Sequence, residues 1–72
     1  MPHKNKRDAQ EMAKQVGIDQ SQVTKSDAGY FIAPQGMTSK IAREVYAKNR
    51  AKGMSKEQAA KIAWSVQKRV DQ

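Results

Sequence analysis

The residues with the clearest potential for chemistry in this chain are cations, and they gather in its second half. Residues 38–72 hold nine of the 14 Lys and Arg residues but only three of the seven Asp and Glu residues, so this part carries +6 of the total net charge of +7. A positive field of this strength favours polyanions such as nucleic acid or an anionic membrane surface. The sequence therefore predicts a polyanion-binding surface, with nucleic acid as the first candidate.

The candidate contact residues follow from helical spacing at about 100° per residue. Several cations fall opposite the apolar faces of two expected helices. Trp64 has Lys61 three residues before it and Lys68 four residues after it, so its indole could stack on an unpaired base beside two phosphate contacts. The predicted nucleic-acid-binding residues are Lys40, Arg43, Arg50, Lys61, Trp64 and Lys68.

Two other interpretations of these residues stay open. Lysines and arginines end both expected helices, where the helix dipole favours cations without any ligand, so a solvated basic face is one alternative. Trp64 projects about 130° from the centre of the apolar stripe of its helix. It is expected either to pack against the N-terminal helix or the β-ribbon, or to serve as a binding platform.

Few residues of this chain are suited to catalysis. The chain has no Cys and a single His, His3, which is expected in a disordered terminus, and its carboxylates are scattered. These residues supply no nucleophile with its base, no pair of acids and no set of metal ligands. Each of the four glycines is explained by a turn or a helix end rather than by a phosphate-binding loop. We therefore predict a protein that is not an enzyme, with no catalytic residue, metal site or cofactor.

The elements that must position the cations are two helices joined at Gly53. This glycine suits the left-handed position just beyond a helix end, and Ser55 with Gln58 three residues later forms a capping box. The sequence therefore predicts helices over residues 38–52 and 55–70, packed as an αα-hairpin. Their apolar faces are expected to meet through Ile41, Val45, Ile62 and Val66.

The first half of the chain supplies a short helix and a β-hairpin. Apolar residues at spacings of three and four predict a helix over residues 8–17 that ends at Gly17, after a basic tail over residues 1–7 that we expect to be disordered. Strand-forming residues on both sides of the turn at 26–29 predict a two-stranded hairpin over residues 22–33. Because such a ribbon is marginal alone in water, it must pack on the helices.

Together these elements predict one small domain over residues 1–72, mainly α with a small β-hairpin. A short N-terminal helix and a two-stranded ribbon pack on a C-terminal αα-hairpin. The longest apolar run, residues 30–33, is far shorter than the ~20 residues of a membrane helix, and no apolar segment typical of a secretory signal follows the N-terminal lysines. The lack of Cys suits a reducing compartment, and we expect a cytoplasmic protein.

Two stretches resemble a known family. The opening Met-Pro-His-Lys-Asn-Lys-Arg-Asp, continuing through Glu11, Lys14 and Val16, resembles the start of the ChaB family of small bacterial proteins. A later segment resembles that family's Glu-x-Ala-x-Lys-Val-Ala-Trp, through Glu57, Ala59, Lys61, Ile62, Ala63 and Trp64. The resemblance implies a small, mainly helical, non-enzymatic protein, labelled a regulator of cation transport by association with a cation/proton antiporter. It also implies that Trp64 is a structural anchor.

The leading functional prediction is a small basic non-enzymatic protein that contacts nucleic acid through its Lys and Arg side chains. The alternative is a ChaB-like protein-interaction or regulatory module, whose protein partner would engage Trp64 or the exposed side of the ribbon. Association with a membrane surface ranks last, because the apolar faces of the helices are needed for the core. A monomer is expected by default.

Overall fold

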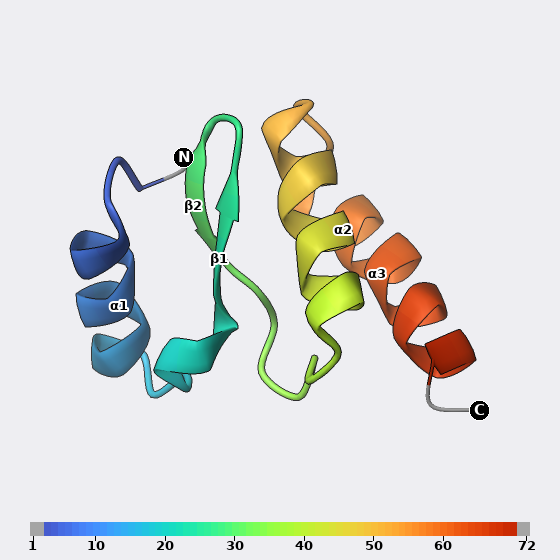
Figure 1. The fold of residues 1–72 in the computed structure, drawn as a ribbon, viewed down its shortest axis with the longest axis horizontal. Coiled ribbons are helices and arrows are strands. Elements are labelled where there is room, and N and C mark those ends of the chain that lie inside the picture. Colours follow the sequence, from blue (N-terminus) through green and yellow to red (C-terminus); the bar gives the residue numbers. More distant parts are fainter. Residues whose placement is uncertain (1–2, 71–72) are drawn as a thin grey trace.

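The chain folds into successive layers in the order α1, β-ribbon, α2 and α3 (Figure 1). This computed structural model describes residues 3–70 apart from the side chain of Val70, so the predictions that concern Met1, Pro2 and that side chain lie outside the described residues. The elements are α1 (Lys6–Gln15), the 3-10 turn η1 (Gln20–Gln22), the strands β1 (Val23–Ser26) and β2 (Gly29–Ile32), and the helices α2 (Lys40–Ala51) and α3 (Lys56–Val70). The predicted fold class, mainly α with a small β-hairpin, is confirmed.

Residues 3–7 form a β-bridge and the start of a helix, so the predicted disordered tail over residues 1–7 is wrong for its described part. Helix α1 begins at Lys6 rather than at residue 8, because the side-chain oxygen of Asn5 accepts a hydrogen bond of 2.9 Å from the amide of Asp8. The backbone groups of His3 exchange two hydrogen bonds of 2.8 Å with Tyr30 in β2. The free edge of a strand offers unpaired N–H and C=O groups, and here it holds the segment that precedes α1.

Glycines end α1 and α2 as the sequence predicts. At the end of α2, the amide of Gly53 donates to the carbonyl of Arg50 at 3.0 Å and that of Met54 donates to Asn49 at 3.1 Å. Gly53 has a φ of +96°, and Gly17 ends α1 in the same way with a φ of +79°. This pair of bonds is the Schellman ending, which needs a residue that tolerates positive φ and turns the chain sharply toward the next element.

Serine caps begin both C-terminal helices. The hydroxyl of Ser39 accepts from the amide of Ala42 at 3.3 Å, and that of Ser55 accepts from the amide of Gln58 at 3.2 Å. Each cap satisfies one of the amides that the first turn of a helix leaves without a partner. The predicted ranges 38–52 and 55–70 therefore differ from the observed helices by Thr38 and by the capping residues Ser39, Lys52 and Ser55.

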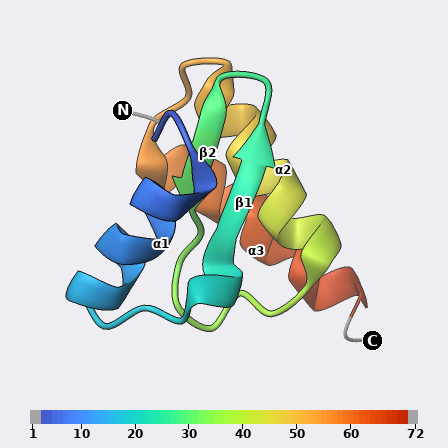
Figure 2. The same ribbon diagram turned by 60° about the vertical axis from the view of Figure 1, so that its left-hand side comes forward.

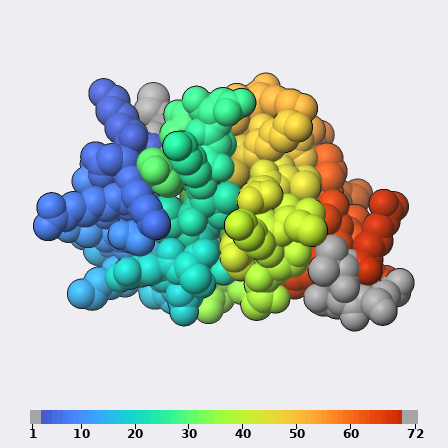
Figure 3. Space-filling model, in the orientation of Figure 1, coloured from blue at the N-terminus to red at the C-terminus, as the bar shows by residue number. Residues whose placement is uncertain are grey.

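The β-ribbon turns at residues 26–29 as the sequence predicts, and it lies between α1 on one face and α2 on the other (Figures 1 and 2). Phe31 is buried with residues of α2 and α3. Because neighbouring residues of a strand point to opposite faces, Tyr30 and Ile32 face α1, where Ala9 and Ala13 are buried. Helix α1 is thus connected to the αα-hairpin through the ribbon, and the layers form consecutive bands in the space-filling view (Figure 3).

Small residues, rather than the predicted aliphatic quartet, form the contact between α2 and α3. Val45 and Val66 pack against the core, but Ile41 and Ile62 are 56% and 42% exposed, so the predicted contact is wrong for both isoleucines. Helices with alanines at their contact approach closely, and longer side chains are then displaced to the edge of the interface. The core cluster consists of Phe31, Ala33, Met37, Ala42, Tyr46, Ala47, Ala59 and Ala63.

The connection between β2 and α2, residues 33–39, runs partly through the interior and is called the β2–α2 loop below. Met37 is its fully buried anchor. The side chain of Gln22 is only 4% exposed, and its Nε2 donates to the carbonyls of Pro34 at 2.6 Å and Met37 at 2.8 Å. The same two carbonyls also accept from the amide of Met37 and from Nη1 of Arg43, so Gln22 shares the satisfaction of this backbone with two other donors.

Two further side chains hold the same loop from the C-terminal helices. Arg43 of α2 donates from Nη1 to the carbonyl of Thr38 at 2.6 Å. Gln67 of α3 donates to the carbonyl of Gly36 at 3.2 Å and accepts from the amide of Ser39 at 3.1 Å. The β2–α2 loop is therefore bonded to both helices as well as to the ribbon.

Gln22→Ala should lower the free energy of unfolding by about 1 to 3 kcal/mol, because the carbonyls of Pro34 and Met37 each lose the hydrogen bond from the Gln22 amide and keep one other donor. Chemical denaturation followed by circular dichroism measures this change. The exposed Gln20, two residues earlier, is the matched control, and Gln20→Ala should change stability by less than about 0.5 kcal/mol. Equal losses in the two variants would contradict the role assigned to the Gln22 amide.

Candidate nucleic-acid interface

The six residues predicted from the sequence fall into two groups. The exposed group carries side chains that are free to meet a ligand, and it consists of Lys40, Lys61, Trp64 and Lys68. The half-buried group consists of Arg43 and Arg50. The prediction that all five cations point outward is therefore wrong for the two arginines.

Arg50 is part of the packing of the fold. Its guanidinium carbon lies 5.6 Å from the centroid of the Phe31 ring, which is the geometry of a cation–π contact. The Nη1 group donates to the carbonyl of Met54 at 3.0 Å, just beyond the end of α2. Arg43 is likewise occupied by carbonyls of the β2–α2 loop. Both arginines thus stabilise the structure around α2 rather than face solvent.

Helix α2 has two buried sides, and this explains why the predicted outward orientation of the two arginines is wrong. It packs against the ribbon as well as against α3. At about 100° per residue the buried arc extends from Ala42 past Tyr46 and Arg50 to Ala47. The outer surface of α2 is narrow as a result, and it carries Glu44 and Lys48.

Trp64 belongs to α3, and its side chain packs against the β2–α2 loop while it remains 38% exposed. Its ring atom Cη2 lies 3.6 Å from the position that a Cβ atom on Gly36 would occupy. Gln67, three residues later on α3, bonds to the carbonyl of the same glycine. The indole is therefore held on one side by protein while the rest of it faces solvent.

The exposed lysines of the candidate interface lie near this indole. Lys61 and Lys68 precede and follow Trp64 by about one helical turn and are exposed. Lys40 comes directly after Ser39, whose amide bonds to Gln67, and it is exposed as well. Trp64 and the three lysines form what we call the Trp64 face.

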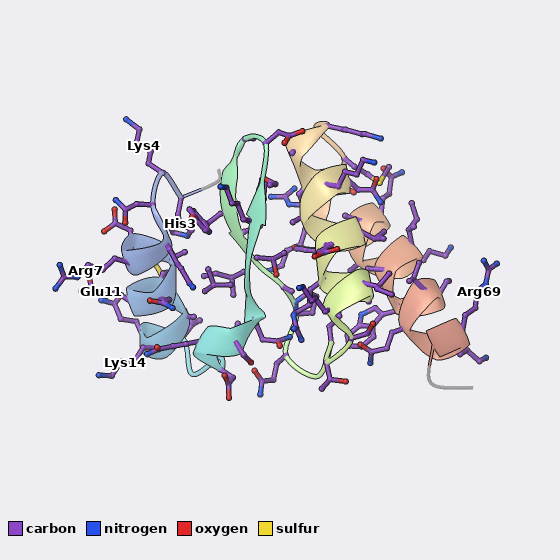
Figure 4. All side chains as sticks on the ribbon, in the orientation of Figure 1. His3, Lys4, Arg7, Glu11, Lys14 and Arg69 are labelled. Carbon is purple, nitrogen blue, oxygen red and sulfur yellow. The ribbon has the colours of Figure 1, made fainter. Side chains whose placement is uncertain are left out.

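Cations also cover the opposite end of the molecule. Of the 14 Lys and Arg residues, 12 are exposed. Figure 4 shows Lys4, Arg7 and Lys14 extending outward at the α1 end, with Glu11 between them, and Arg69 extending outward at the α3 end. The sequence places the positive charge mainly in the αα-hairpin, but the folded chain exposes a second basic surface on α1.

Other kinds of site find little support in residues 3–70. No group of three His, Cys, Asp or Glu side chains in this part of the chain is placed to hold a metal ion. None of the helices within the same range is both long enough and apolar enough to cross a membrane. A hollow of about 480 Å³ lies between the ribbon tip and α2, and its lining mixes lysines with carboxylates, so it offers no single charge to a ligand.

Comparison of the chain with protein-family models, curated proteins and solved structures finds no match. Geometry and charge therefore carry the functional assignment.

Arg50→Gln should lower the free energy of unfolding by about 1 to 2 kcal/mol, because it removes a charged hydrogen bond and a cation–π contact. Thermal or urea unfolding measures the loss. Lys48→Gln, a change of the same charge on the exposed side of α2, should stay within about 0.5 kcal/mol of the parent protein. If both variants keep the parent stability, Arg50 is a surface cation after all.

Stability should also fall at alkaline pH through Tyr46. Burial raises the pKa of this hydroxyl above its ordinary value of 10.0, and the nearby charge of Arg50 partly offsets the increase. The folded state holds the proton more tightly than the unfolded chain, so this contribution is fully present below the unfolded pKa and is lost as pH rises through the folded one. Tyr46→Phe should make the decline of the unfolding free energy above pH 10.0 less steep. Identical slopes in urea titrations of the two proteins would refute this.

Proposed function

We propose that this protein is a small non-enzymatic binding protein for single-stranded nucleic acid. Trp64 stacks on an unpaired base, and Lys40, Lys61 and Lys68 neutralise neighbouring phosphates. The observation that carries the proposal is the partly exposed indole, which is fixed against the β2–α2 loop between exposed lysines.

A fixed aromatic ring suits this role for two reasons. The ring already packs against Gly36, so little conformational freedom is lost when a base stacks on its open side. Stacking on an aromatic side chain contributes about 1 to 3 kcal/mol per base and tolerates any base. The bases of a duplex are already stacked on one another, which favours single strands as the ligand.

Further parts of the proposal concern the protein as a whole. It acts without a cofactor, as a monomer and in the cytoplasm. The ChaB resemblance stays a prediction and supports a second proposal, a protein-interaction or regulatory module. The exposed side of Trp64 favours that proposal too, because partly exposed Trp side chains are frequent anchors of protein interfaces. Pull-downs from nuclease-treated lysate separate the two, since only a protein partner survives nuclease.

The fluorescence of Trp64 reports directly on nucleic-acid binding, because it is the only Trp in the chain. We expect an oligothymidine to quench this emission, with an affinity that falls as salt rises. Three phosphate contacts on a single strand predict a slope of log K against log[salt] of about −2. Absence of quenching and of any mobility shift at low salt would end the proposal.

Paired charge variants locate the contacts. Lys61→Gln with Lys68→Gln should reduce the magnitude of the salt slope by about 1.4, at ~0.7 for each lost phosphate contact. Lys6→Gln with Lys14→Gln removes the same charge from α1 and should leave the slope close to that of the parent. Equal effects of the two pairs would indicate binding through net charge alone rather than through the Trp64 face.

A further inference from the structure

An apolar strip lies along one edge of the αα-hairpin, where α2 meets α3. Ile41 and Ile62 are 56% and 42% exposed, and Val45 and Val66 are half-buried between them and the core. Few large apolar side chains are this exposed in the described part of the chain. We call these four residues the hairpin groove.

The four side chains share one edge because of how the two helices are packed. Val45 and Val66 touch the core cluster from α2 and α3, and each isoleucine lies one turn before the valine of its own helix. Since the two helices are antiparallel, Ile41 and Ile62 lie toward opposite ends of the groove. The other edge of the hairpin is covered by the β2–α2 loop, through its bonds to Arg43 and Gln67.

The groove is a valley with its apolar floor recessed. Val45 and Val66 form the floor, because they are half-buried while the isoleucines stand exposed. A hollow of about 360 Å³ adjoins Ile62 on the side of the turn between the helices, and it is lined by Met54, Gln58, Lys61 and Ile62. A valley between two antiparallel helices is the shape that a third helix fills in a helical bundle.

Cations border the groove on both helices. Lys48 lies about one turn after Val45 on α2, and Lys52 lies one turn further on; on their other side both line the hollow between α2 and the ribbon tip. Arg69 lies about one turn after Val66 on α3, and Figure 4 shows it extending outward at that end of the molecule. All three are exposed. Glu44 is the acidic residue on the outer surface of α2, so the border is mainly positive.

We propose that the hairpin groove binds an amphipathic helix of a partner protein, with apolar residues on one face and acidic residues beside them. The apolar residues of the partner helix, spaced at i, i+3, i+4 and i+7, pack on Ile41, Val45, Ile62 and Val66. The acidic residues pair with Lys48, Lys52 and Arg69, which orients the helix and excludes basic partners.

The charges and the shape of the groove favour this occupant over two others. A second copy of the chain would bring the same basic border against itself, with a net charge of +7 on each copy. An anionic membrane surface matches the charge, but a flat surface reaches the exposed isoleucines and leaves the recessed valines uncovered. A helix enters the valley and covers all four.

Synthetic peptides test the inference with the full-length protein. The probe is a helical peptide with Leu at i, i+3, i+4 and i+7 and Glu at its other exposed positions, and the control is a scrambled peptide of the same composition and charge. Titration calorimetry should show saturable binding of the probe at one site and much weaker binding of the scrambled peptide. Equal binding of the two peptides, or none, would overturn the proposal.

Variants with a matched control locate the site. Ile41→Ser with Ile62→Ser should weaken binding of the probe by about tenfold or more, because both anchors are lost. Met12→Ser with Val16→Ser changes two α1 side chains that are just as exposed, at 42% and 58%, and should leave the affinity unchanged. Circular dichroism confirms that both proteins are folded. Equal weakening in both would refute the assignment.

Three further measurements test the cations beside the groove and the two alternative ligands, a membrane and a second copy of the chain. Lys48→Gln with Lys52→Gln should weaken the binding of the acidic peptide and reduce its salt dependence. An unchanged affinity would contradict the role of these lysines in binding. Binding to vesicles that contain phosphatidylglycerol, lost in Ile41→Ser with Ile62→Ser while the peptide does not bind, would assign the groove to membranes. Concentration-dependent dimers abolished by the same variant would assign it to a second copy. Either result overturns the proposal.

Discussion

The carbonyl groups of the β2–α2 loop impose the constraint on which the rest of this structure depends. The loop runs partly through the interior, and its polar backbone must find partners there. Gln22 from the ribbon side, Arg43 from α2 and Gln67 from α3 each bond to it. Because three elements meet at one connection, the loop fixes the ribbon relative to both helices. This explains how a chain with so few large apolar residues holds a defined arrangement of layers.

The two C-terminal helices have different tasks as a consequence. Helix α2 is packed on two sides, and its arginines are used to hold the loop and to cover Phe31. Helix α3 is the outer layer and keeps more of its circumference exposed (Figure 1). Trp64 lies on the side of α3 next to the loop, Ile62 lies on the side that borders the groove, and Lys61 lines a hollow beside Ile62. The inner helix organises the fold, whereas the outer helix presents two distinct surfaces.

The sequence predicts the features of this fold that depend on neighbouring residues. The glycine endings at Gly17 and Gly53, the serine caps and the turn of the ribbon each follow from a few adjacent residues. Contacts between distant segments are not encoded locally, so the pairing of His3 with β2 and the burial of Arg50 against Phe31 were missed. One signal was present in the sequence. Ala42, Ala47 and Ala51 are spread over about half of the circumference of α2, and they indicate a helix that is approached from more than one side.

The abundance of alanine in the interior also bears on how the fold responds to temperature. In the described part of the chain, seven of the ten buried apolar residues are alanines, each of which hides a single methyl group. The heat capacity of unfolding grows with the apolar area that becomes exposed, so for this length it should be small. A small heat capacity flattens the dependence of free energy on temperature. The free energy of unfolding of such a protein is low at its maximum and falls slowly above and below that temperature, so the protein keeps a modest stability over a broad thermal range.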